Sequence, residues 1–213
     1  KNKFPVFAEK PDLVFLDSAA SALKVDDMIT AVNNCYSFEY SNVHRGVYDL
    51  SAKLTLKFEN ARKNISNFIS SPSFENIIFT KSATEAINLV AHSFTKDFIK
   101  EDDEILISHM EHHANIVPWH LIKKYKNFKL IAAKLNDVGE INYDDLLKKI
   151  NSRTKLISLT HMSNVTGSIT NFDKINNIRK KFDIPIMIDG CQFAPHHILD
   201  IKDLNPDFYV FSA

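Results

Sequence analysis

The chain has 213 residues, of which 45% are hydrophobic and 24% are charged, and its formal net charge is zero. This composition is ordinary for a globular protein large enough to bury a substantial core. A neutral chain offers no electrostatic basis for binding nucleic acid or an anionic membrane, and no apolar run approaches the roughly 18–20 residues of a membrane span. We therefore expect neither nucleic acid nor a membrane among its partners.

The sequence contains two cysteines, Cys35 and Cys191, which are too few for a disulfide framework. A reducing compartment is the default for such a chain, and residues 1–5 lack the apolar core of a signal peptide. We therefore expect a cytoplasmic protein. The first residue is Lys1 rather than Met, so we expect the chain to be trimmed or partial.

Apolar runs with the length of strands alternate along the chain with helix-length segments. Seven runs predict strands: Leu13–Leu16, Ile77–Thr80, Glu104–Ser108, Lys129–Ala133, Lys155–Thr160, Ile186–Asp189 and Asp207–Phe211. Six segments predict helices: Asp26–Tyr40, Ser51–Ile69, Ala83–Phe98, Ala114–Tyr125, Tyr143–Lys149 and Asp173–Phe182. This alternation predicts an α/β fold around a mainly parallel sheet. The chain has four glycines and no Gly-rich loop, so it lacks the signature of a dinucleotide site or a P-loop.

The most informative motif follows Pro185, where Ile186–Ile188 reads as a buried central strand that ends on Asp189. Open α/β sheets place their ligand-binding groups at this carboxyl end of the strands. A buried carboxylate is costly without a cationic or hydrogen-bonding partner. A protonated pyridine nitrogen is one such partner, and Gln192 would then reach a phenolic oxygen on the same ring. The alternative is an aspartate that caps the following loop or helix.

A second motif begins at Thr80, where a predicted strand, a turn with small hydroxyl residues and a helix start follow one another. Free N–H groups at a helix start bind anions, and Ser82 and Thr84 add hydroxyl donors for a phosphate. The alternative is a capping box, in which Ser82 is the N-cap and Glu85 stands three residues on. Both interpretations hold together, because the cap and the anion site share one helix end.

A third motif, Ser108–Asn115, places three histidines within five residues at another strand end. Adjacent His112 and His113 do not easily face one ion, and the segment has no HExxH pattern and no nearby cysteine, so we expect no zinc site. An imidazole at this position is able to lie flat on a heteroaromatic ring, and the strand end favours His112 or His113 for that role. For His109 we prefer a satisfied loop histidine.

Weaker signals come from three further positions. Asn164 follows a predicted strand and offers both a donor and an acceptor to a ring oxygen or a carboxylate; the alternative is a turn residue ahead of Gly167. His44 and Arg45 lie in a polar insert that reaches a site or a subunit partner, or is simply a solvated loop. Together the strand ends describe one crevice with an anion cradle, a carboxylate, an amide and an imidazole, which a phosphorylated, protonated pyridine such as pyridoxal 5'-phosphate satisfies.

In their order and their residues, these motifs resemble those of the cysteine desulfurases of the Suf-type group. That group lies within the class V aminotransferase-like, fold-type I enzymes that use pyridoxal phosphate. The matching segments are Phe15–Ala22, Val43–Gly46, Thr84–Ala91, Met110–Trp119, Ser163–Val165, Asp189–Gln192 and Asp207–Ser212. The run Met110–Trp119 is highly specific to this group. The resemblance implies a three-layer α/β/α fold with a mostly parallel, seven-stranded sheet. Residues 1–213 would form most of the cofactor-binding large domain, residues 1–45 would join the small domain, and the C-terminal small domain would be absent.

The resemblance also implies a role for individual residues. Asp189 would contact the ring nitrogen of the cofactor, Gln192 its ring hydroxyl and His112 its ring face. The residues that would contact its phosphate are Ala83, Thr84 and Ser212. His112 would also be the catalytic residue that assists proton transfers. Asn164 would contact the cofactor or the substrate carboxylate, and Ala20 and His44 would lie near the substrate.

The implied reaction converts L-cysteine to L-alanine and leaves a persulfide on an enzyme cysteine, from which sulfur passes to an acceptor protein for iron–sulfur cluster assembly. The family is typically homodimeric. The family's cofactor-binding lysine would follow Ala213 by about two positions, its persulfide cysteine lies further downstream, and neither Cys35 nor Cys191 fits that role. Two alternatives stay open: a selenocysteine lyase, and a non-catalytic truncated fragment that only binds cofactor or a partner subunit.

Overall fold

The computed structural model describes residues 1–212, apart from the side chains at positions 178 and 179. It divides into two compact units, residues 1–68 and the part from residue 69 onward. Among the described residues, no helix has the length and apolar character needed to cross a membrane.

The first unit is built of helices. They are α1 (Val6–Glu9), α2 (Asp26–Asn34), the π-helical turn η1 (Cys35–Glu39) that continues α2, and α3 (Asp49–Phe68). Throughout residues 1–68, all of which the structure describes, no hydrophobic side chain is buried. This unit therefore has no apolar core of its own.

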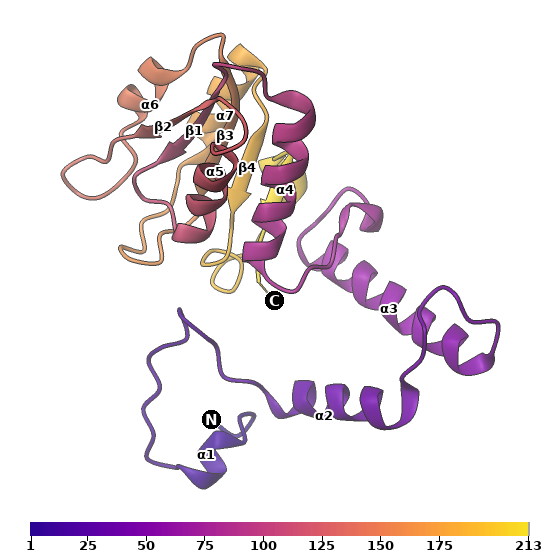
Figure 1. Ribbon diagram of the computed structural model, residues 1–213. Helices are drawn as coiled ribbons and strands as arrows, with labels where there is room; N and C mark the ends of the chain where they lie inside the picture. The colour runs from indigo at the N-terminus through magenta and orange to yellow at the C-terminus, as the bar shows by residue number, and fades with distance from the viewer. Residues whose placement is uncertain (213) are drawn as a thin grey trace. The chain divides into compact units, whose positions relative to one another are not determined.

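The second unit contains a parallel sheet of five strands in the order β2-β1-β3-β4-β5 (Figure 1). The strands are β1 (Glu104–Ser108), β2 (Lys129–Ala133), β3 (Thr154–Thr160), β4 (Ile186–Asp189) and β5 (Phe208–Val210). The helical elements between and around them are η2 (Phe74–Asn76), α4 (Ala83–Phe98), η3 (His113–Asn115), α5 (Val117–Ile122), α6 (Tyr143–Lys149), α7 (Phe172–Phe182) and α8 (Ile201–Leu204). Every strand pairing is parallel, so all five strands end at one edge of the sheet.

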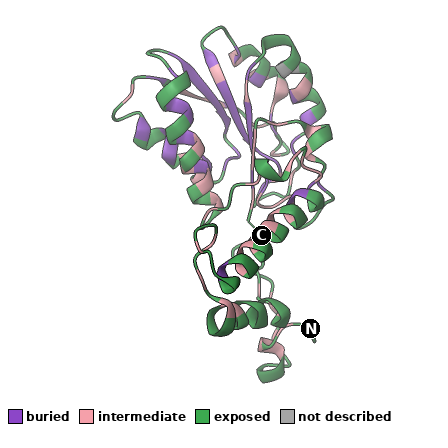
Figure 2. Ribbon diagram, turned by 90° about the vertical axis from the view of Figure 1, so that its right-hand side faces the viewer, coloured by how far each residue is buried: buried purple, intermediate pink, exposed green. Residues whose placement is uncertain are grey.

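Helices cover both faces of this sheet, and the side-chain alternation of each strand decides which face a residue serves. On β1, Leu106 packs with α6 and α7, whereas Ile105 and Ile107 pack with α4 and α5. On β4, Ile186 and Ile188 face the first of these layers and Met187 faces the second. Every residue of β1 and β4 is buried, and Figure 2 shows the strands mostly in the purple of buried residues. The expected three-layer α/β/α arrangement is therefore confirmed.

The expected number of strands was wrong: over residues 1–212 the sheet has five strands, not seven. Leu13–Leu16 lies in the first unit with Val14 and Leu16 mostly exposed, and Ile77–Thr80 lies outside the sheet. An apolar run becomes a strand only where a neighbouring strand takes up its backbone hydrogen bonds. None of the five strands pairs with either segment in the part of the chain that the structure describes.

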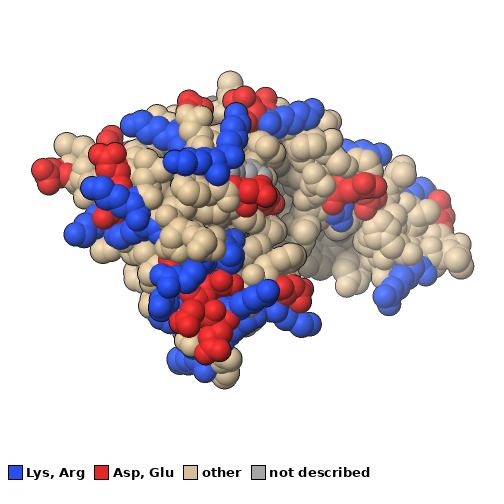
Figure 3. All heavy atoms as spheres, turned by 90° about the horizontal axis from the view of Figure 1, so that it is seen from above, with Lys and Arg blue, Asp and Glu red and all other residues tan. Residues whose placement is uncertain are grey.

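Several predicted bounds are confirmed, including those of β1, β2, β4, α4 and α6. Two long helix predictions were too simple. The segment Asp26–Tyr40 forms α2 and η1, and Ala114–Tyr125 forms most of η3 and then α5. In α5 the ring of Pro118 stands in the first turn, where its missing N–H costs nothing. On the face shown in Figure 3, positive and negative side chains are interspersed.

The capping box at the start of α4 is present. The hydroxyl of Ser82 accepts a hydrogen bond from the Glu85 N–H at 3.1 Å, and the Glu85 carboxylate accepts one from the Lys81 N–H. Two backbone donors at the helix start are thus satisfied by side chains. This cap fixes where α4 begins, and with it the position of the N–H groups of the first turn.

We expect Ser82→Ala to lower the free energy of unfolding by about 1 kcal/mol, because the N-cap acceptor is lost. The matched control is Ser93→Ala, which removes an exposed hydroxyl bonded to the Leu89 carbonyl within the same helix. The control should change stability by less than about 0.5 kcal/mol. Chemical denaturation followed by circular dichroism measures both, and equal effects of the two changes would contradict the capping role.

Candidate functional site

The carboxyl edge of the sheet gathers the polar motifs that follow β1, β3 and β4. In the strand register Thr160 lies opposite Asp189, and Asp189 lies opposite Val210. The segments that begin at His109, His161 and Gly190 therefore all leave the sheet on the same side. This is where open parallel sheets bind their ligands.

Asp189 is the centre of this edge. It is the last residue of β4 and only 4% exposed. One carboxylate oxygen accepts a hydrogen bond from the Cys191 N–H at 3.1 Å, so the aspartate also stabilises its own turn, as the alternative interpretation expected. Among the described side chains, no lysine, arginine or histidine forms an ion pair with Asp189. A buried carboxylate in this setting fits a cationic ring nitrogen as its partner.

The turn after Asp189 is held by unusually close packing against β5. A Cβ added to Gly190 would lie 2.1 Å from the Tyr209 hydroxyl and 2.2–2.3 Å from carbons of the same ring. The Gly190 N–H donates to the Val210 carbonyl at 2.7 Å. Only glycine leaves space for this approach, and the approach determines where Asp189 and Gln192 stand.

A buried histidine supports the same turn. His161 follows β3, and its Nδ1 lies 2.9 Å from the Tyr209 hydroxyl. Its ring stacks on Phe193, with the centroids 3.5 Å apart and the planes 11° from parallel. Burial and, to a smaller extent, His197, which also stacks on Phe193, lower the pKa of His161 to about 4. His161 is therefore neutral at physiological pH, and it joins β3 to β5 and to the turn.

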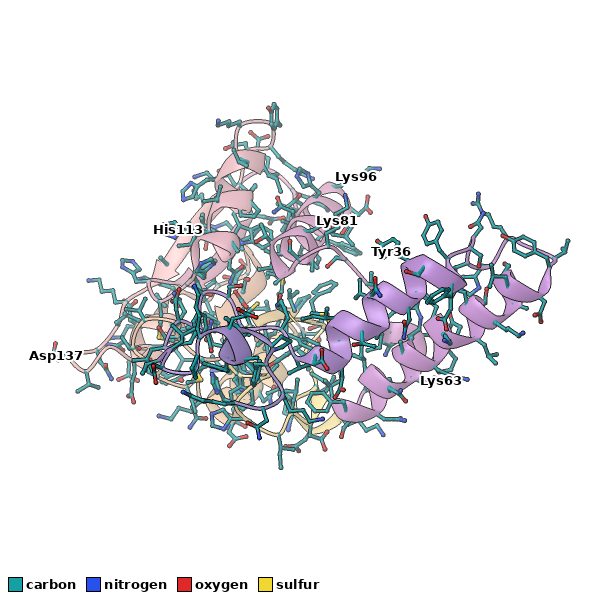
Figure 4. All side chains as sticks on the ribbon, turned by 90° about the horizontal axis from the view of Figure 1, so that it is seen from below. Tyr36, Lys63, Lys81, Lys96, His113 and Asp137 are labelled. Carbon is teal, nitrogen blue, oxygen red and sulfur yellow. The ribbon has the colours of Figure 1, made fainter. Side chains whose placement is uncertain are left out.

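His112 lies beside the strand ends with its side chain exposed. Its Nδ1 accepts a hydrogen bond from the Ala114 N–H at 3.2 Å, which caps η3 and leaves Nε2 as the protonated nitrogen of the neutral ring. His113, labelled in Figure 4, meets His112 edge to face at 5.9 Å. The capping bond holds the His112 ring in one orientation, and its stacking on a cofactor stays a prediction.

The first turn of α4 belongs to the same edge. Because α4 packs along the sheet and then leads into the amino end of β1, the helix begins at the carboxyl edge (Figure 1). Phe94 of this helix meets Phe208 of β5 edge to face at 6.1 Å. Ala83 and Thr84 stand in the first turn, where free N–H groups favour an anion.

The remaining predicted residues are placed as follows. Gln192 is half-buried in the turn after Asp189, Asn164 is exposed in the turn after β3, and Ser212 is exposed just past β5. Ala20 and His44 belong to the first unit, where His44 Nε2 lies 3.1 Å from a Glu59 carboxylate oxygen. Their contact with a substrate stays a prediction.

The structure also identifies polar residues at this edge that received no role from the sequence. They are Glu111, His161 and Tyr209, all within or beside the quoted motifs. Tyr209 stands in an apolar run, whereas Glu111 and His161 stand in the polar segments after β1 and β3, where the residue pattern does not distinguish them from their neighbours. Among the described residues, no group of three or more His, Cys, Asp or Glu side chains is arranged to hold a metal ion. Cys191 is a half-buried free thiol, and burial and Asp189 both raise its pKa.

A helix start and a buried aspartate thus lie at the carboxyl edge of a parallel sheet, where α/β folds bind their ligands. Residues 14–213 match the aminotransferase class-V family. The chain belongs to this family, whose members depend on pyridoxal 5'-phosphate.

Individual relatives are described as cysteine desulfurases. A probable cysteine desulfurase of Staphylococcus aureus strain N315 is 41% identical over 213 residues, covering 99% of this chain and 52% of the relative. One from Mycolicibacterium paratuberculosis is 38% identical over 217 residues, covering 100% of this chain and 32% of the relative. The chain thus spans about half, or less, of the length of these relatives.

Two solved structures share the fold over almost the whole chain. The cysteine desulfurase CsdA from Escherichia coli superposes with a TM-score of 0.88 at 34% identity, covering 99% of this chain and 52% of that one. The apo cysteine desulfurase from Thermococcus onnurineus NA1 gives a TM-score of 0.90 at 33% identity, with 99% and 51% coverage.

We expect Gly190→Ala to lower the free energy of unfolding by about 1–3 kcal/mol, because the new methyl overlaps the Tyr209 ring. Chemical denaturation measures the loss. In the double variant Gly190→Ala/Tyr209→Ala the overlap is gone, so the combined loss should be smaller than the sum of the two single losses. Strict additivity would show that the Gly190–Tyr209 approach is not the cause.

The buried neutral His161 should make the fold sensitive to acid. In the unfolded chain its pKa is about 6.5, so below that pH the unfolded state binds more protons than the folded state, in which the pKa is about 4. Stability is then lost as the pH falls from about 6.5 toward 4, by on the order of 3 kcal/mol. Denaturation curves of His161→Gln should show a smaller acid loss, whereas exposed His120→Gln should behave as wild type. An unchanged acid loss in His161→Gln would refute this.

Proposed function

We propose that this chain supplies the cofactor-binding part of a pyridoxal-phosphate-dependent cysteine desulfurase. The single observation that carries the proposal is the buried Asp189, which ends β4 without an ion-pair partner among the described side chains at the edge where α4 begins. The family and the desulfurase relatives agree with it. When bound, the cofactor would supply an electron-accepting ring for reaction at the substrate α-carbon.

Asp189 would hold the ring nitrogen in its protonated form. A carboxylate shielded from water favours a cation next to it far more than an exposed one does. The amide of Gln192, in the turn that Gly190 and Tyr209 hold in place, would contact the ring hydroxyl. The protein would in this way keep the ring electron-poor and fix its tilt.

The phosphate would bind at the start of α4. The backbone N–H of Ala83, the hydroxyl of Thr84 and the positive end of the helix all favour a dianion there. Ser212, just past β5, would add a hydroxyl. The capping box is compatible with this role because its side chains occupy only the N–H groups of Lys81 and Glu85.

His112 would cover the face of the ring and assist proton transfers at the substrate. Its Nδ1 is occupied by the cap of η3, so its Nε2–H is the group available to move a proton. Asn164 would contact the cofactor or the substrate carboxylate, and Ala20 and His44 would lie near the substrate. These assignments rest on the family resemblance.

The substrate would be L-cysteine, released as L-alanine, with the sulfur carried first by an enzyme cysteine and then by an acceptor protein for iron–sulfur cluster assembly. We propose a homodimer as the working form. Cys191 is a poor sulfur carrier because its raised pKa disfavours the nucleophilic thiolate. Turnover is therefore to be tested in a protein that also contains the family's cofactor-binding lysine and persulfide cysteine.

The decisive variant is Asp189→Ala. Losing one charge-assisted contact of about 1.5–3 kcal/mol should weaken pyridoxal-phosphate binding about 10- to 100-fold, because the ring nitrogen loses its partner. Absorbance titration of the present chain measures the binding, and alanine production from L-cysteine measures turnover in the full-length protein. Exposed Asp137→Ala, labelled in Figure 4, is the control and should match wild type in both assays.

The outcomes separate the candidate functions. Alanine formed from L-selenocysteine but not from L-cysteine would indicate a selenocysteine lyase. Tight cofactor binding with no turnover of either substrate in the full-length protein would indicate a non-catalytic cofactor-binding protein. Equal cofactor affinity in Asp189→Ala and wild type would contradict the assignment of the site.

A further inference from the structure

A buried glutamate at the same edge has no part in the roles assigned above. Glu111 follows β1 by three residues and is only 8% exposed. A carboxyl group withdrawn from water to this degree is costly unless hydrogen bonds compensate for the lost hydration. The hydrogen bonds of Glu111 therefore indicate which parts of the fold this carboxyl group stabilises.

Hydrogen bonds connect Glu111 to three elements. The Ser108 hydroxyl at the end of β1 donates to one carboxyl oxygen, and the Asn115 side-chain amide of η3 donates to the other at 2.7 Å. A backbone hydrogen bond joins the carboxyl to Thr160 at the end of β3. The carboxyl group thus ties the loop that carries His112 to the ends of both strands.

A second layer of buried groups fixes this arrangement. The side-chain oxygen of Asn115 accepts from the Ser158 hydroxyl at 2.6 Å and from the Trp119 indole at 3.3 Å. Asn115, Ser158 and Trp119 are fully buried. Because Asn115 is held by β3 and α5 at once, its amide is fixed toward Glu111, and the loop between them has little freedom.

The electrostatic setting of Glu111 is unusual for a carboxyl group. Burial raises its pKa most, Asp189 at the end of β4 adds to the rise, and the hydrogen bonds from Ser108, Asn115 and Thr160 oppose it, so that the pKa of Glu111 lies at about 7. The groups that face Glu111 are then a hydroxyl from β1, an amide from η3, a backbone group from β3 and a carboxylate from β4. It exchanges its proton near neutral pH.

We propose that Glu111 is a positioning residue that holds the His112 loop on the sheet, and that its protonation depends on the charge at Asp189. When a cationic ring binds at Asp189, Glu111 loses a proton to solvent. This inference rests on the proposed cofactor site. Without a ring, the negative charge of Asp189 favours the protonated form of the buried Glu111. A cation at Asp189 offsets the negative charge that Glu111 feels, so the ionised form of Glu111 becomes the favoured one.

Proton release on binding determines whether the affinity for the ligand rises or falls with pH. If ligand binding releases a proton, affinity rises with pH through the range in which the free protein holds that proton and the complex does not. The release is largest near or just below pH 7, and it disappears well below and well above that range. At most about one proton per site is involved.

The experiment uses pyridoxamine 5'-phosphate, which needs no lysine to bind. Calorimetric titration in pairs of buffers with different ionisation heats gives the protons released per ligand bound, at pH values from 5.5 to 9. We expect wild type to release more protons than Glu111→Gln near pH 7, with the difference vanishing at both extremes. Exposed Glu75→Gln is the matched control and should match wild type at every pH.

Ser108→Ala provides a second test that keeps the carboxyl group. Removing a hydrogen bond that stabilises the ionised form raises the pKa of Glu111, so the maximum of proton release should move to higher pH. A residue with a purely structural role would shift no such maximum. This variant also keeps the test decisive if Glu111→Gln fails to fold.

Proton release tests the role of Glu111, whereas binding of the ligand itself tests the proposed cofactor site. Binding of the ligand with identical proton release in wild type and Glu111→Gln, or an unmoved maximum in Ser108→Ala, would overturn the role of Glu111 and leave the cofactor site standing. No binding of the ligand to wild type would overturn both.

Discussion

The parallel pairing of β1, β3 and β4 is the constraint on which the rest of the site depends. These strands are buried almost throughout, so a slip in register would bring polar residues into the core and expose apolar ones. In the observed register Asp189 lies between Thr160 and Val210. The polar segments that leave the strands are thereby delivered to one edge, whatever their distance along the chain.

Two buried polar clusters lie at the same sheet edge as Asp189, and their pKa shifts have the same physical cause. Glu111 has a raised pKa and His161 has a lowered one, because burial disfavours the charged form of each group. Between about pH 4 and pH 7 both groups are largely neutral before a ring binds, so neither places a positive charge against Asp189. The edge of the sheet is in this way left to one cation, the ring nitrogen in our proposal.

The correctly predicted elements are specified by residues within or directly beside each element. β1 and β4 are buried from end to end and have apolar central residues because they are covered on both faces, and α4 begins with a capping box formed by Ser82 and Glu85. The two wrong strands fail for the opposite reason. Leu13–Leu16 and Ile77–Thr80 have suitable residues, but strand formation depends on a partner strand, and no local pattern specifies one.

The sequence by itself determined the alternation of strands and helices, the strand ends that carry Asp189 and the His112 loop, and the family, because these depend on residue order alone. Only the tertiary structure decided that Glu111 and His161 belong to the site. Their partners are remote in sequence: Ser158 reaches Asn115 across 43 positions, and His161 reaches Tyr209 across 48. Burial and contacts of this range arise from the packing of strands against one another, which residue order does not reveal.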